Sequence, residues 1–100
     1  MDVSFVAELW RHPGEDGWHF LTVPPEPTDE LRARATGRHA PFGALPVEAT
    51  IGGTTWRTSL FADRKLDAYL LPVKTAVRRA ERLEIGVTVK VSLTLDPPAP

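Results

Sequence analysis

The segment VTVKVSLTL at residues 87–95 constrains the fold of this chain more than any other stretch. Valine and leucine alternate strictly along it with threonine, lysine and serine. In a β-strand successive side chains point to opposite faces, so the pattern predicts a strand with one face in a core and the other in solvent. We therefore expect the chain to be built mainly from half-buried strands.

Five further stretches carry strand signals, which brings the expected number of strands to about six. They lie near residues 3–10, 18–23, 47–51, 54–61 and 67–73. The breaker-rich segment HPGEDG separates the first two, which are expected to form a hairpin. Gly52 and Gly53 are expected to join the next pair, because a two-residue hairpin turn needs positive φ angles at one or both positions.

Two segments have helical character, near residues 28–35 and 74–83. The first follows several prolines and carries acidic residues in its first turn, which favours a helix start. The second places Ala76, Val77, Ala80 and Leu83 on one apolar stripe. The stretch 36–46 has no periodicity, and a stretch of this length is either a functional loop or a mobile one.

Antiparallel strands, hairpins and two short helices predict a small closed or nearly closed β-barrel. Closure removes the exposed edges that a small β-protein must otherwise protect. The chain has 100 residues, of which 42% are hydrophobic and 25% charged, as in an ordinary globular domain. We expect one domain over residues 1–96 and a disordered proline-rich tail at 97–100.

The composition argues against several classes of protein. With a net charge of −1, the protein as a whole has no positive field that would attract nucleic acid or an anionic membrane. A local basic patch is compatible with this charge. The absence of cysteine removes disulfides, thiolate metal sites and cysteine nucleophiles. The first residues lack the pattern of a secretory signal, and no apolar run approaches the roughly 18 residues of a membrane span. A cytoplasmic protein without membrane contact is expected, and its oligomeric state stays open.

The strand-to-helix junction holds the first candidate site. Lys74, Arg78 and Arg82 follow one another at intervals of four residues. On a helix such like-charged pairs repel by about 0.2–0.5 kcal/mol each, and a lysine in the first turn opposes the helix dipole. One interpretation is a solvated face paired with Glu81 and Glu84. The other is an anion site, where free backbone N–H groups and Lys74 converge on a carboxylate or phosphate.

Three more residues complete this candidate site. Arg57 and Ser59 share one face of the strand 54–61 with Phe61. Ser59 is either a buried hydroxyl bonded to the backbone or a ligand contact, and no G-x-S-x-G elbow surrounds it that would mark a nucleophile. Tyr69 is either a half-buried aromatic at the rim or a group that orients a ligand carboxylate or donates a proton.

No metal or cofactor is expected. His12 and His19 flank the first hairpin and would make a three-ligand set with Glu8 or Asp16, but no metal-site spacing appears. Seven large aromatic residues either fill the core or line a pocket: Phe5, Trp10, Trp18, Phe20, Phe42, Trp56 and Phe61. With about six strands a deep internal cavity is not expected. A ligand would then lie at a barrel mouth or in a groove under the 36–46 loop.

The order of four motifs, WHFLTVP, VEATIGGTTWRTSLF, AYLLPVKTAVRRAERLEIG and LTLD, resembles a known family. This is the bacterial and archaeal family numbered nineteen-oh-five among domains of unknown function, and the resemblance runs from Phe5 to Asp96. It implies a small β-barrel, found alone or fused to a segment associated with bacteriocin protection, and no assigned activity. The positions similar to the family are Trp18, Pro24, Gly52, Gly53, Ser59, Leu60, Tyr69, Pro72, Lys74, Arg78 and Gly86. Members often have Gly-Asp where this chain has Gly86-Val87.

Three functional classes are compatible with these observations. The first is a binding module for a small anionic or amphipathic ligand, or for a peptide end, at a barrel mouth. Its ligand-binding residues would be Lys74, Arg78, Tyr69, Ser59 and Arg57. The second is a small cofactor-free enzyme of the cyclase or isomerase type that uses Tyr69 and Lys74 for proton transfer. The third is single-stranded nucleic-acid binding, against which the net charge counts.

Overall fold

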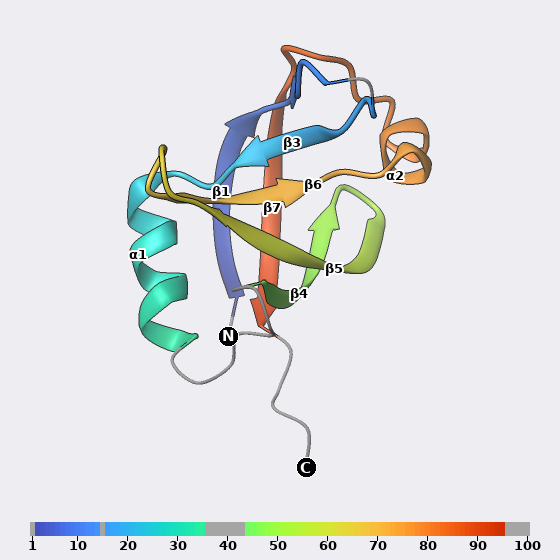
Figure 1. Ribbon diagram of the computed structural model, residues 1–100. Coiled ribbons are helices and arrows are strands. Elements are labelled where there is room, and N and C mark those ends of the chain that lie inside the picture. The colour runs from blue at the N-terminus through green and yellow to red at the C-terminus, as the bar shows by residue number, and fades with distance from the viewer. Residues whose placement is uncertain (1, 15, 36–43, 96–100) are drawn as a thin grey trace.

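The described part of the chain forms a nearly closed barrel of seven antiparallel strands with two short helices (Figure 1). The structure is a computed structural model that describes residues 2–14, 16–35 and 44–95. The strands are β1 (Asp2–Glu8), β2 (Trp10–Arg11), β3 (His19–Thr22), β4 (Leu45–Ile51), β5 (Thr54–Asp63), β6 (Ala68–Pro72) and β7 (Thr88–Leu95). The helices are α1 (Pro25–Arg34) and α2 (Thr75–Ala80). The predicted barrel is thus confirmed, with β2 as an added short strand. The predicted tail and most of the 36–46 loop lie outside the described residues.

The strand order β1-β7-β4-β5-β6-β3-β2 explains how the sheet curls back on itself. Its two outermost strands, β1 and β2, follow one another in the chain and are separated only by Leu9. The Leu9 N–H donates to the Val87 carbonyl at 3.0 Å, and the Leu9 carbonyl accepts from the Gly86 N–H at 2.8 Å. These bonds hold the first strand segment against the loop before β7 at the place where the barrel nearly closes.

The expected hairpin between residues 3–10 and 18–23 is wrong for most of its length. Only β2 pairs with β3, whereas β1 pairs along its whole length with β7. The strong alternation of β7 gives β1 a long partner with a matching apolar face, and β3 is too short to do the same. Val89, Val91 and Leu93 are buried as the alternation predicts, whereas Val87 precedes the strand and is exposed.

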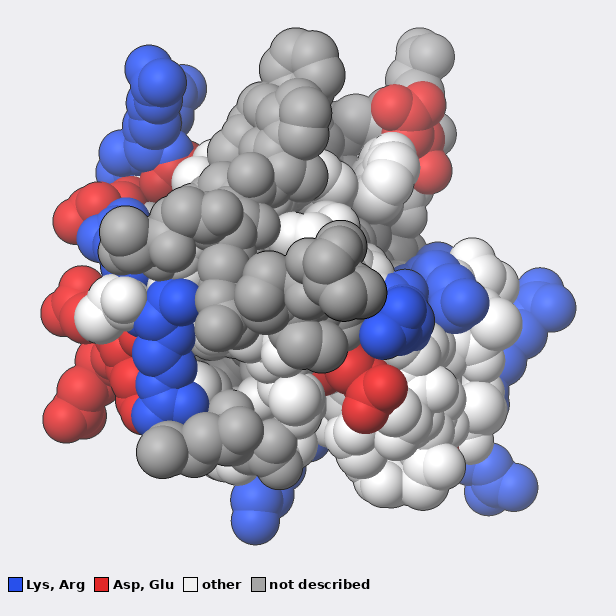
Figure 2. All heavy atoms as spheres, turned by 90° about the horizontal axis from the view of Figure 1, so that it is seen from below, with Lys and Arg blue, Asp and Glu red and all other residues white. Residues whose placement is uncertain are grey.

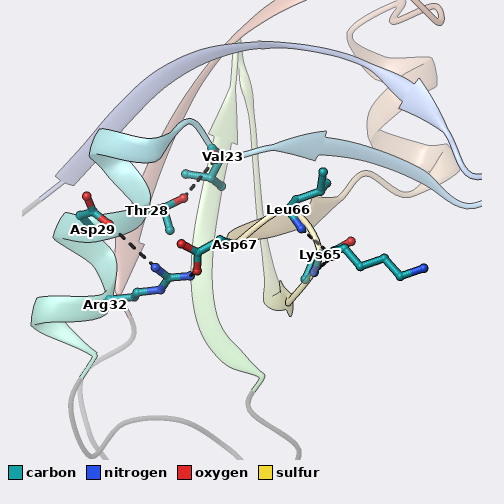
Figure 3. A network of polar contacts seen from close by, with 8 residues as sticks. Val23, Thr28, Asp29, Arg32, Lys65, Leu66 and Asp67 are labelled. Carbon is teal, nitrogen blue, oxygen red and sulfur yellow. Dashed lines mark hydrogen bonds and ion pairs between the residues drawn. The ribbon is translucent and has the colours of Figure 1, made fainter.

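Helix α1 starts earlier than predicted because its prolines are tolerated there. Pro24 is the N-cap residue, and a proline in the first turn loses no hydrogen bond, since those N–H groups have no partner within the helix. Thr28 is fully buried and its hydroxyl donates to the Val23 carbonyl at 3.0 Å. Arg32 forms ion pairs with Asp29 and, at 2.7 Å, with Asp67 in the turn between β5 and β6 (Figure 3). Helix α1 is therefore tied to that turn.

Helix α2 is shorter than the predicted 74–83 segment. Lys74 is its N-cap residue with an extended backbone, and Arg82 lies beyond its end with a φ of 53°. The N–H of Arg82 donates to the Arg79 carbonyl and that of Leu83 donates to the Arg78 carbonyl, which is the Schellman arrangement of a helix C-terminus. Only Arg78 of the three spaced cations is within the helix, so the expected like-charge stripe does not form. Among the described residues no helix is long and apolar enough to cross a membrane.

The β4–β5 hairpin turns at the glycine pair, as predicted, but only one of the two glycines needs special geometry. Gly52 has a φ of 56°, and Gly53 has a φ outside the left-handed region, which is the pattern of a type II′ turn. The turn lies against the end of α2, where the Thr54 hydroxyl donates to Glu81 Oε2 at 2.7 Å. This contact ties the hairpin to the α2 segment.

Candidate functional site

A cleft of about 740 Å³ opens where β5 and β6 separate. It is lined by residues 16–19 before β3, residues 56–59 and 61 of β5, and residues 72–75 and 78 of β6 and α2. Four of the five residues predicted as a site, Arg57, Ser59, Lys74 and Arg78, are among them. The structure thus places Arg57 and Ser59 of β5 in the same cleft as Lys74 and Arg78, which follow β6.

The cleft exists because β5 changes partners along its length. Residues 54–60 pair with β4, whereas residues 61–63 pair with β6. Beyond the pair Phe61↔Leu70 the two strands part, since β5 continues along β4 while β6 leads through Pro72 into α2. At the other end of the gap the Thr54–Glu81 hydrogen bond joins the two sides again. The cleft is therefore held open between two fixed points.

Exposed aromatic side chains flank the cleft. Phe61 lies on the outward face of β5 and is 43% exposed, and Trp18 before β3 is 50% exposed. Trp18 stacks on Phe20 with ring centroids 6.0 Å apart, and Phe20 in turn packs against Trp10 at 5.2 Å. The exposed rings of Trp18 and Phe61 offer apolar surface to a ligand. The entropic cost of ordering Trp18 on binding is low, because its stack on Phe20 already holds it in place.

The remaining predicted aromatics divide between core and exterior. Phe5 and Trp56 are buried in the core, although Trp56 also reaches the cleft wall. Phe42 lies outside the described residues. The aromatic set is thus neither all core nor all pocket, and of its described members Trp18 and Phe61 are the exposed ones.

Arg78 lines the cleft, but the nitrogens of its guanidinium are engaged in contacts within the protein. Its Nε donates to the Val73 carbonyl at 3.1 Å and its Nη2 to the Thr75 hydroxyl at 2.8 Å. Its Nη1 lies 3.2 Å from His19 Nε2, and His19 Nδ1 lies 2.7 Å from the Gly17 carbonyl. A neutral imidazole that donates from Nδ1 to Gly17 and accepts at Nε2 from Arg78 satisfies both contacts. Arg78 therefore clamps the end of β6 to the start of β3.

Lys74 is the cation that the cleft leaves available. Its side chain is exposed and makes no hydrogen bond or ion pair with any residue in the described ranges. The Ser59 hydroxyl likewise has no partner among the described residues. Asp16 is the acidic side chain of the lining, against three cations. Figure 2, a view from below, shows several Lys and Arg side chains on the α2 side, whereas acidic and basic side chains alternate on the α1 side.

Tyr69 does not belong to this cleft. Successive residues of a strand face opposite ways, so the face of β6 that presents Pro72 to the cleft excludes Tyr69. Its side chain is 3% exposed, and burial raises the pKa of its hydroxyl above the ordinary value of 10.0, an effect that the nearby Arg32 guanidinium opposes. The structure therefore does not bring Tyr69 and Lys74 together in this cleft.

The histidine cluster considered from the sequence offers no ligand set within the described residues. His12 Nδ1 accepts a hydrogen bond from the Gly14 N–H at 3.1 Å, and both ring nitrogens of His19 are engaged as above. His39 lies outside the described residues. The contact between His19 and Arg78 joins residues 59 positions apart, and no motif in the sequence signals it.

Comparison with known families supports the sequence resemblance. The family model described as "Domain of unknown function (DUF1905)" matches residues 5–93. The matched range contains the whole lining of the cleft. Comparison with curated proteins gave no match.

Proposed function

The chain belongs to the DUF1905 family, whose function is unknown, and we propose that its cleft binds a small ligand carrying both a negative charge and an apolar group. One observation carries the proposal: Lys74, which has no partner among the described residues, lines the same cleft as the exposed rings of Trp18 and Phe61. The volume of about 740 Å³ falls within the roughly 300–1,000 Å³ of small-molecule pockets.

Each part of the lining has a matching ligand group. The Lys74 ammonium pairs with a carboxylate or phosphate, and the Ser59 hydroxyl is available to donate to the same anion. The aromatic rings cover an apolar body, with a gain of about 25 cal/mol per Å² of apolar surface removed from water. An exposed ion pair alone is worth about 0.2–1 kcal/mol, so the apolar contact has to supply much of the affinity.

Binding is better supported than catalysis at this site. Tyr69 does not line the cleft and is buried, which counts against a proton-transfer pair of Tyr69 and Lys74 there. The His19 imidazole uses both ring nitrogens in contacts with Gly17 and Arg78, and it is therefore not free to act as a base for Ser59.

Thermal unfolding with benzoate and benzamide tests the proposal. The two compounds share the ring and differ in charge, and ionic strength is held constant with chloride because excluded salts stabilise most proteins. At ten times its Kd a ligand stabilises by roughly 1.4 kcal/mol, which for a domain of this size moves Tm by several degrees. Benzoate is expected to raise Tm more than benzamide does, and sulfate, which lacks the ring, is expected to raise it less.

Two variants locate the effect. Lys74→Ala removes the available cation, and Lys90→Ala removes an exposed lysine of β7 that does not line the cleft. The benzoate increment is expected to disappear in Lys74→Ala and to persist in Lys90→Ala. Equal increments in the parent and in both variants would contradict the proposal. Native mass spectrometry of the purified protein would then identify any ligand that it retains.

A further inference from the structure

A second hollow, of about 310 Å³, adjoins the cleft, and we call it the aromatic hollow. It is lined by His12, Asp16, Trp18, Phe20 and Phe61. Three of these residues, Asp16, Trp18 and Phe61, also line the cleft, whereas none of the three cationic side chains of the cleft lines the hollow. The hollow therefore combines three aromatic rings with one carboxylate.

The strand register places the rings of Phe20 and Phe61 on the same side of the sheet. Strand β6 lies between β3 and β5 (Figure 1), and it pairs through Pro72 with Phe20 and through Leu70 with Phe61. Paired residues share a face, and so do residues two apart on one strand, so all four point the same way. Leu71 belongs to the core cluster and the adjacent Leu70 does not, so this face is the outward one. The two rings thus project from the outside of the barrel on either side of β6.

The strand spacing leaves room for a ligand group between these rings. Two strand separations of about 4.8 Å and an offset of two residues of about 3.3 Å each put the Cα atoms of Phe20 and Phe61 about 12 Å apart. Trp18 stacks on Phe20 with an angle of 12° between the rings, whereas Phe61 makes no ring contact within the described part of the chain. A cation is attracted to the face of a ring within about 6 Å of its centroid. A cationic group in the hollow can therefore contact rings on two sides.

Asp16 supplies the negative charge of the hollow. Its carboxylate makes no hydrogen bond or ion pair with any described residue. His12 Nδ1 accepts a hydrogen bond from the Gly14 N–H at 3.1 Å, so this imidazole is neutral, with its proton on Nε2. Arg11 approaches the neighbouring Gly17, where an added Cβ would lie 3.7 Å from Nη2, but Arg11 does not line the hollow. The described lining of the hollow is thus net negative.

We propose that the aromatic hollow binds a quaternary ammonium group, which lies against the three rings with its charge beside Asp16. This inference goes beyond the proposed function, since it requires no anion at Lys74. A primary ammonium has three N–H donors, and the hollow offers few acceptors for them besides the Asp16 carboxylate. A quaternary ammonium has no donor to leave unsatisfied, and the negative faces of aromatic rings stabilise its charge.

The test compares choline with two related compounds. Dimethylbutanol is its neutral isostere, in which carbon replaces the charged nitrogen, and ethanolamine carries a primary ammonium. Dissociation constants are measured by NMR from the shifts of the Trp18 indole N–H and the amide of residue 61, at an ionic strength held constant with sodium chloride. Asp16→Asn removes the charge and keeps the shape, and Phe61→Leu removes a ring and keeps an apolar side chain. Glu84→Gln is the control, because Glu84 is exposed and does not line the hollow.

Choline is expected to bind about fivefold more tightly than either dimethylbutanol or ethanolamine. Asp16→Asn and Phe61→Leu should each weaken choline binding by about fivefold, because each removes one source of attraction for the cation. Both variants should leave the affinity for dimethylbutanol within about twofold of the parent, since neither removes the apolar surface of the hollow. Glu84→Gln should behave as the parent does.

Several results would overturn the inference. Absence of choline binding, or equal affinities for choline and dimethylbutanol, would show that the hollow does not recognise a cation. Ethanolamine that binds as tightly as choline would show that the carboxylate alone is recognised and not the methylated nitrogen. Choline binding that either site variant leaves unchanged would place the cation elsewhere on the protein. The proposed function fails separately, because Lys74→Ala should abolish the benzoate increment and should not weaken choline binding.

Discussion

Replacement of Gly52 by alanine should destabilise the protein far more than the same replacement at Gly53. Gly52 has a φ of 56°, where a residue with a Cβ pays about 1–2 kcal/mol. The added Cβ would lie 1.9 Å from Glu81 Oε1, so the Glu81 side chain has to move. That movement breaks its hydrogen bond with Thr54, a net loss of about 0.5–1.5 kcal/mol.

The expected total for Gly52→Ala is about 2 kcal/mol, after allowance for the lower entropy of alanine in the unfolded chain. Gly53 has an ordinary φ and a Cβ there would meet no atom within 4 Å, so Gly53→Ala should change stability by less than about 1 kcal/mol. Urea unfolding measures both. With a slope of about 2 kcal/mol per M, the midpoint of Gly52→Ala should fall by about 1 M at unchanged slope.

A double-mutant cycle separates the two contributions at this turn. In a Glu81→Ala background the side-chain conflict is gone, so Gly52→Ala should then cost only the backbone strain of about 1 kcal/mol. Equal costs for the two glycines would refute the assignment of strain to Gly52. A cost of Gly52→Ala that is unchanged by Glu81→Ala would refute the steric contribution from the α2 segment.

Two further predictions follow from the structure. Arg82→Gly should stabilise the protein by about 0.5–1 kcal/mol in urea unfolding, because Arg82 occupies the left-handed C-terminal position of α2 that glycine prefers, and a loss of stability would contradict this assignment. Tyr69, the single tyrosine of the chain, should ionise at higher pH in the native protein than in urea, as followed by the absorbance of the phenolate. Since the unfolded chain then loses this proton first, stability should fall as the pH rises above about 10, and the fall should be smaller in Tyr69→Phe; equal slopes would show that burial does not raise this pKa.

The sequence by itself determined the fold class and the faces of the strands. The alternation in residues 87–95 predicted a half-buried strand, and the shared outward face of Arg57, Ser59 and Phe61 followed from the same period of two. The glycine pair marked the hairpin turn. Helix limits were less accurate, because the left-handed conformation of Arg82 that ends α2 depends on its surroundings and leaves no glycine in the sequence.

Only the tertiary structure decided which strand edges meet. The sequence of β5 carries no sign of a break, yet residues 54–60 pair with β4 and residues 61–63 pair with β6. The cleft results from this change of partner. Arg78, predicted as a ligand contact, lines the cleft and also contacts His19, which lies 59 positions away in the sequence. Tyr69 does not line the cleft that Lys74 lines, although the two are close in sequence. Side-chain periodicity indicates which face of a strand is buried, whereas the partner at its edge is chosen by main-chain hydrogen bonds that every residue type except proline offers alike.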